Sequence, residues 1–100
     1  MVSQVEVTIY SSELCQRVAI SSQELAEMVS HGIVQPCDQR AVEWQFDEAV
    51  VTEIARAARL RRDLQIDWAG VALALQLLEE VDGLRRENEV LRRRLARLEE

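Results

Sequence analysis

The side chains that could carry out acid–base, nucleophilic or metal chemistry are few in this chain of 100 residues. There is one histidine, His31, and the two cysteines, Cys15 and Cys37, form neither a paired redox motif nor a metal knuckle. With His31 as the one histidine, we identify no Ser-His-Asp set, and a metal centre built on several histidines is excluded within one chain. The three glycines are isolated, so no glycine-rich loop precedes a helix to hold a phosphate. We therefore predict a protein that is not an enzyme and uses no metal or cofactor.

The distribution of charge points to a class of partner. Eighteen acidic residues and twelve arginines, with no lysine, give a net charge of −6. Residues 1–54 contain nine acids and two bases, a net charge of −7, whereas residues 55–100 contain nine acids and ten bases. An acidic surface repels phosphate and attracts a basic partner. The N-terminal half is therefore suited to contact a basic protein surface.

The first half of the chain carries signals for one strand and two short helices. Alternating apolar residues predict a half-buried strand over residues 4–9. A pair of serines can cap a helix over residues 11–18. Ser21 and Glu24 then form the Ser-x-x-Glu capping box of a second helix, and Gly32 stands where a left-handed C-cap is expected. These signals predict two short helices joined by a turn.

The remaining elements complete a recognisable order. Alternation over residues 41–46 predicts another strand, as half of a small β-hairpin. Asp47 can cap a helix over residues 48–64, and Asp67 can cap a fourth helix that runs towards the end of the chain. We predict a mainly α protein with a winged helix-turn-helix domain over residues 1–66 and a long helix over residues 67–100.

The strongest pattern in the fourth helix is a leucine at every seventh residue, which is typical of a coiled coil. The leucines hold heptad position d, and oppositely charged residues flank them at g and e, as a parallel pair of helices requires. Asn88 at position a favours two helices in register. We predict a homodimer; the alternative is that the leucines pack back on the domain. Within the dimer an antiparallel pair stays open, although it would place Arg85 opposite Arg92. The predicted dimerisation residues are Leu77, Val81, Leu84, Asn88, Leu91, Leu95 and Leu98.

A winged helix-turn-helix suggests DNA recognition, but the charges oppose it. Readers of duplex DNA need positive charge on the second helix and on the wing. The second helix carries Glu24 and Glu27 and no arginine, and the presumed wing carries Asp38 and Glu43 against Arg40. We therefore expect the domain to disfavour nucleic acid.

Two sets of residues carry a resemblance to known families. Leu25 followed by residues 32–36 (GIVQP) resembles the MerR-type helix-turn-helix. The chain is more closely similar to the chaperone-modulator family CbpM, over residues 44–47 (WQFD), 56–61 (RAARLR), 64–75 (LQIDWAGVALAL) and 87–95 (ENxxLRxRL). The resemblance covers nearly the whole chain and implies a MerR-like winged helix-turn-helix with a long C-terminal coiled-coil helix.

The CbpM resemblance also implies a function. Members of that family bind the J domain of a DnaJ-like co-chaperone, CbpA, and thereby block its stimulation of a DnaK-type chaperone. J domains present a basic helix to the chaperone, so an acidic module can occupy the same surface. We expect the protein in the cytoplasm, with both cysteines reduced and without a membrane partner. The candidate contact residues are Glu13, Glu24, Glu27, Asp38, Glu43, Trp44 and Trp68, of which the two tryptophans are also candidates for the core.

The alternative function is a MerR-type transcriptional regulator that binds DNA as a dimer. One cluster of arginines could favour it, although such a helix surface is more often solvated. The cluster consists of Arg56, Arg59, Arg61 and Arg62.

Overall fold

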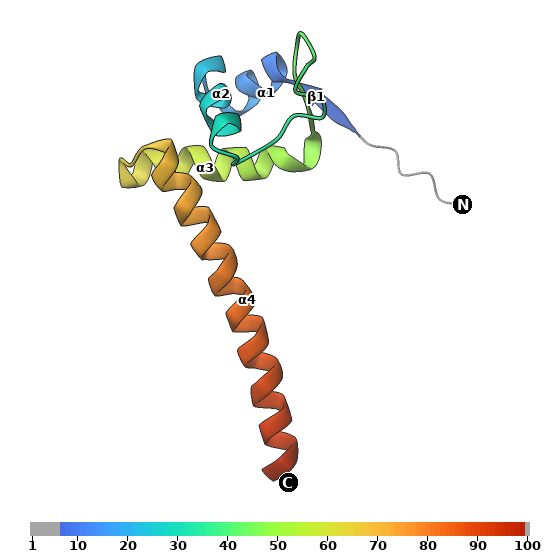
Figure 1. Cartoon of the computed structure of the whole chain (residues 1–100), viewed down its shortest axis with the longest axis vertical. Helices are drawn as coiled ribbons and strands as arrows, with labels where there is room; N and C mark the ends of the chain where they lie inside the picture. The colour runs from blue at the N-terminus through green and yellow to red at the C-terminus, as the bar shows by residue number, and fades with distance from the viewer. Residues whose placement is uncertain (1–6, 100) are drawn as a thin grey trace, which may run out of the picture.

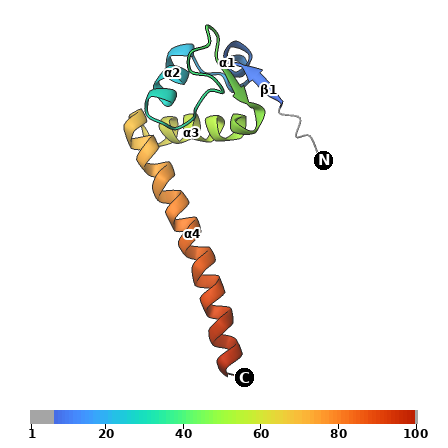
Figure 2. The same cartoon turned by 45° about the vertical axis from the view of Figure 1, so that its right-hand side comes forward.

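The computed structural model describes residues 7–99, which form four α-helices, one short 3₁₀ helix and two short strands. Figure 1 shows the first three helices and the strands packed together as a head, from which the fourth helix extends as a single rod. Figure 2, from a second direction, shows the same separation. The predicted mainly α fold, with a helix-turn-helix and a long C-terminal helix, is confirmed.

Helix α1 (Ser11–Val18) follows the first strand without an intervening loop. Its N-cap residue is Tyr10, and no side chain caps it. The predicted serine cap is wrong because both serines lie inside the helix and the backbone N–H of Ser11 donates to the carbonyl of Trp44, at 2.8 Å. A tertiary contact therefore replaces the local cap. Leu14 is buried, and Ala19 ends the helix in the left-handed region.

Helix α2 (Ser22–Ser30) begins and ends at the predicted signals. The hydroxyl of Ser21 accepts from the N–H of Glu24 at 3.0 Å, and the N–H of Ser21 donates to the Glu24 carboxylate at 3.2 Å. At the other end, Gly32 has a φ of 73°, a region that suits glycine. The N–H groups of Gly32 and Ile33 donate to carbonyls in the last turn of α2, which closes a Schellman motif.

The two strands pair in an antiparallel sheet but do not form a hairpin. Strand β1 (Thr8–Tyr10) pairs with β2 (Gln45–Asp47), and the buried residues Ile9 and Phe46 lie opposite each other. Since α1 and α2 lie between the two strands in sequence, the predicted hairpin is wrong in its connection. Of the strand predicted over residues 4–9, residues 4–6 lie outside the described part of the chain.

The second strand is displaced from its predicted position. The alternation of apolar and polar residues predicted this strand over residues 41–46. In the structure Val42 is fully exposed, and the chain bends at residues 41–43 instead of forming a strand. Asp38 holds the turn, because its carboxylate accepts from the N–H of Arg40 and its carbonyl accepts from the N–H of Ala41. The N–H of Cys37 donates to the carbonyl of Gln45 and closes residues 37–45 into a wing-like loop.

Helix α3 (Val51–Leu64) continues from the 3₁₀ turn η1 (Glu48–Val50). Asp47 accepts a hydrogen bond from the N–H of Ala49 and so caps the 3₁₀ turn. The predicted helix over residues 48–64 thus begins as this turn, and the α-helix itself starts at Val51 without a side-chain cap. The buried side chains of α3 are Ile54, Ala57 and Ala58, of which Ile54 is among the largest fully buried side chains of the core. Gln65 ends α3 in the left-handed region.

Helix α4 (Trp68–Glu99) has 32 residues and is about 48 Å long. The carboxylate of Asp67 accepts from the N–H of Gly70 at 2.9 Å, which confirms the predicted cap. Trp68 and Val71 in the first turn are buried with the head, and from Leu77 onward the leucines are exposed. Within residues 7–99, no helix is both apolar and long enough to cross a membrane.

Candidate partner-binding surface

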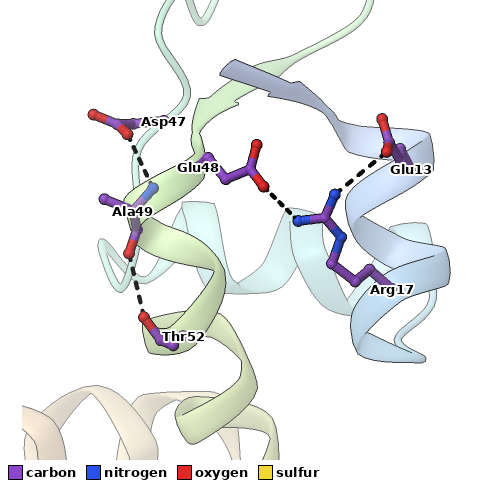
Figure 3. Close-up of polar contacts among 6 residues, drawn as sticks. All are labelled: Glu13, Arg17, Asp47, Glu48, Ala49 and Thr52. Atoms are coloured by element: carbon purple, nitrogen blue, oxygen red, sulfur yellow. Dashed lines mark hydrogen bonds and ion pairs between the residues drawn. The ribbon is translucent and has the colours of Figure 1, made fainter. Parts of the chain in front are cut away.

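Three charged side chains meet where α1 lies beside the end of β2. In Figure 3, Arg17 reaches from α1 towards Glu48, with Glu13 on its other side. Arg17 Nη1 lies 2.7 Å from Glu48 Oε1, and Nη2 lies 3.3 Å from Glu13 Oε1. The hydrogen bond to Glu48 raises the pKa of the Arg17 guanidinium above its usual value. One arginine shared by two acids leaves this corner with a net charge of −1.

The wing-like loop adds an acid to the same corner. The Ser12 hydroxyl donates to Glu43 Oε1 at 2.8 Å, so Glu43 lies against the first turn of α1. Ser12 directly precedes Glu13 in the sequence. Asp38 lies in the turn of the same loop and is exposed. The structure therefore brings Glu43 of the loop to the turn of α1 that also carries Glu13, while Asp38 lies in the turn of the same loop.

The two acids of α2 have different structural roles. The Glu24 carboxylate holds the N-terminus of α2 through the capping box. Together with burial, which is the larger cause, the negative charge of Glu24 raises the pKa of the Cys15 thiol. Glu27 is half-buried one turn later, and in the described part of the chain neither its carboxylate nor that of Glu24 forms a salt bridge. Neither acid of the second helix is therefore paired with a basic side chain in the described residues.

The two tryptophans lie in different environments. Trp44 is half-buried, meets the ring of Phe46 edge-on at 6.3 Å between centroids, and donates to the carbonyl of Gln39 at 3.3 Å. Trp68 is only 2% exposed and lies under the guanidinium of Arg61, whose central carbon is 5.0 Å from the ring centroid. Burial fits the interpretation of Trp68 as a core residue, and Trp44 is the tryptophan that retains exposed surface.

The arginine cluster of the DNA alternative is partly engaged within the protein. Arg61 covers Trp68 and is half-buried, and Arg62 donates to the carbonyl of Ala58 at 3.4 Å. Arg56 and Arg59 remain exposed on α3. These exposed arginines lie on the third helix, whereas the second helix of the helix-turn-helix carries Glu24 and Glu27.

The heptad residues of α4 are exposed in the single chain. The relative exposure of these leucines and valine exceeds that of every residue in the core. None of them packs against the head, so the alternative in which they fold back on the domain is not what the structure shows. The exposed set comprises Leu77, Val81, Leu84, Asn88, Leu91, Leu95 and Leu98.

A groove at the base of α4 was missed by the sequence analysis. It has a volume of about 370 Å³ and is open where α4 leaves the head. The spacing of Leu75, Leu78 and Asp82 along α4 was visible in the sequence, but the groove also needs α3 and the turn after α2. Its lining residues are Ile33, Glu53, Arg56, Leu75, Leu78, Glu79 and Asp82.

No group of metal-ligating side chains marks a cofactor site in the part of the chain that the structure describes. Three or more histidine, cysteine or acidic side chains do not gather anywhere in residues 7–99 as a metal site requires. Both cysteines are free thiols. What the described surface offers is charge and apolar area, which suit the binding of another macromolecule.

The helix-turn-helix, the wing-like loop and the long helix define the class of protein. A family model described as "MerR HTH family regulatory protein" matches residues 9–93. Chaperone modulatory protein CbpM of Citrobacter koseri is 43% identical over 93 residues, which are 93% of this chain and 92% of the relative. The CbpM proteins of Pseudomonas entomophila (46% over 84 residues; 84% and 83%) and Salmonella paratyphi B (41% over 93 residues; 93% and 92%) are also similar. The chain belongs to the CbpM family within this MerR-like class.

Proposed function

We propose that the protein binds the J domain of a CbpA-type DnaJ-like co-chaperone and inhibits its stimulation of a DnaK-type chaperone. The observation that carries the proposal is the acidic second helix, where a DNA reader of this fold needs positive charge. The names of the relatives, which call them chaperone modulatory proteins, support a role in a chaperone system. The two free thiols fit a reducing compartment, and we place this role in the cytoplasm.

The proposed contact surface is the acidic side of the head. It combines α2 with the corner where Glu43 lies against α1, and Trp44 supplies partly exposed aromatic area beside the loop. Opposite charges accelerate association and select the partner, while apolar contacts slow dissociation. We assign the electrostatic part of the contact to Glu13, Glu24, Glu27, Asp38 and Glu43.

We also propose that the protein acts as a homodimer through α4. The exposed leucines of α4 form a continuous seam that a second copy would cover. At position a, Asn88 meets its counterpart only when two helices lie in register, which favours a parallel pair. The heads then lie at the same end of the dimer.

The test is the ATPase turnover of the DnaK-type chaperone, stimulated by the cognate co-chaperone, with and without this protein. We use the double variant Glu24→Gln/Glu27→Arg, because glutamine at the third helical position keeps the capping box that arginine would remove. The control is Glu89→Arg, an exposed acid on the distal part of α4.

Three outcomes separate the possibilities. Inhibition by the unmodified protein that is lost in the double variant and kept in the control supports the proposed surface. Inhibition that persists in the double variant places the contact elsewhere on the chain. No inhibition by the unmodified protein, with its cognate co-chaperone in the assay, overturns the proposed function.

A further inference from the structure

The groove at the base of α4 continues into a second hollow. That hollow has a volume of about 340 Å³ and shares Ile33, Leu75 and Glu79 with the first. It extends to His31, which follows α2 one helical turn after Glu27. The two hollows therefore form one channel that leads from the acidic helix α2 to the base of α4.

The channel has an apolar floor and an acidic rim. Ile33 and Leu75 are half-buried against the core, and Leu78 is 37% exposed beside them. Glu53, Glu79 and Asp82 surround this floor, against one base, Arg56. Within residues 7–99, none of these four charged side chains forms a salt bridge, so the rim carries an uncompensated net charge of −2.

Leu75 and Asp82 of the channel lie on a different face of α4 from the dimer seam, whereas Leu78 flanks the seam. The seam uses heptad positions a and d, whereas Leu75 and Asp82 hold position b and Leu78 holds position e. Helical geometry turns position b away from the a/d face. A coiled-coil partner that covers the seam therefore borders the channel at Leu78 but leaves Leu75 and Asp82 uncovered.

We infer that this channel binds the basic amphipathic helix of the J domain, with apolar side chains on Ile33, Leu75 and Leu78 and basic side chains facing the rim acids. An amphipathic helix docks in a groove through apolar residues on one face, and its flanking charges meet those of the rim. The inference rests on the proposed function. It adds an apolar contact, with Ile33, Leu75 and Leu78, to the electrostatic contact proposed above.

The experiment measures the affinity of the full-length protein for the isolated J domain of its cognate co-chaperone, by isothermal titration calorimetry. The charge variant is Glu79→Arg/Asp82→Arg, and its control is Glu89→Arg, which holds the same heptad position as Asp82 one heptad later. The apolar variant is Leu78→Gln. Its control is Val90→Gln, because Val90 is 40% exposed on the same helix and lies outside the channel.

We expect each channel variant to weaken binding roughly tenfold and each control to leave it unchanged. All the substituted side chains are exposed, and circular dichroism confirms that each variant keeps its helices. If the unmodified protein binds the J domain and the channel variants bind equally well, the channel is not the docking site, although the proposed function stands. If the unmodified protein does not bind the J domain, both the proposed function and this inference are wrong.

Sedimentation velocity on the same variants tests the other occupant, a second copy of the chain. The distal half of α4 is rich in arginine and could also meet an acidic rim. Because Leu78 flanks the seam, the charge variant decides this point: if Glu79→Arg/Asp82→Arg changes the oligomeric state while Glu89→Arg does not, a second copy fills the channel and the inference is overturned.

Discussion

Single side chains at helix ends fix the geometry of the acidic surface. Ser21 and Glu24 satisfy each other's backbone N–H groups, so a residue proposed to face the partner also starts the helix that carries it. The sequence predicted this box because all of its partners lie within four residues. It did not predict the contact from Ser12 to Glu43, since that contact joins residues 31 positions apart.

Removing the capping box should destabilise the head without touching its core. We expect Ser21→Ala to lower the free energy of unfolding by about 1 kcal/mol, because the N–H of Glu24 loses its acceptor. Urea denaturation followed by circular dichroism measures the change. Glu24→Gln is the matched control and should cost less, because glutamine can still accept from the N–H of Ser21. Equal losses in the two variants would contradict this assignment.

The two thiols should react at different rates. Burial, reinforced by the charge of Glu24, raises the pKa of the Cys15 thiol, whereas Cys37 is exposed. Because the thiolate is the nucleophile, iodoacetamide at about pH 8 should modify Cys37 first, as followed by peptide mass spectrometry. Faster modification of Cys15 in the folded protein would refute the prediction.

The same shift links Cys15 to the pH dependence of stability. The folded state holds the Cys15 proton more tightly than the unfolded state, so the stabilising contribution is complete below the pKa of the unfolded thiol, about 8.5. It is lost as the pH rises through that value towards the folded pKa. Between about pH 8 and 10, urea unfolding of the Cys15→Ala variant should depend less steeply on pH than that of the unmodified protein.

The helices could be predicted from the sequence more fully than the strands. Caps at Ser21, Asp47 and Asp67 are local signals, and the structure contains all three. The strand over residues 41–46 was misplaced because alternation cannot show that the turn at Asp38 takes up its first residues. Its pairing with β1 is non-local, so no short-range pattern could reveal it.

The exposed heptad leucines of α4 lead to a prediction about dimerisation. Leu84→Glu combined with Leu91→Glu puts like charges at two d positions, which should convert a dimer into monomers. Light scattering at tens of micromolar, a concentration typical for weak helix pairs, measures the mass. Asn88→Leu should instead raise the stability of the assembly while weakening its preference for two chains. If the unmodified protein has the mass of a monomer, the predicted dimerisation through α4 is wrong.

At the scale of the whole molecule, the order of elements and the distribution of charge point to different functions. The fold is that of the MerR-like helix-turn-helix family, but the exposed arginines Arg56 and Arg59 lie on α3 rather than on α2. The sequence alone identified this conflict. The groove could not be predicted, because it depends on the direction in which α4 leaves the head.

We expect no specific binding to duplex DNA. An electrophoretic mobility shift assay at about 50 mM salt, where phosphate attraction is weakly screened, should show no defined complex. The acidic α2 would face the phosphates and repel them. A shifted band that survives competitor DNA would restore the transcriptional alternative.

The rod-like exposure of α4 makes its order depend on protein concentration. An isolated helix in water is marginal, and beyond Asp82, the last α4 residue of the groove, the described part of α4 contributes no side chain to the buried core. Backbone amides in the distal turns should therefore exchange with deuterium rapidly in dilute protein and slowly once a second copy covers the seam. Amides of the head should exchange at the same rate in both conditions. If α4 pairs with a second copy, we thus expect dilution to unfold the distal turns of α4 while the head, with its acidic surface, stays folded.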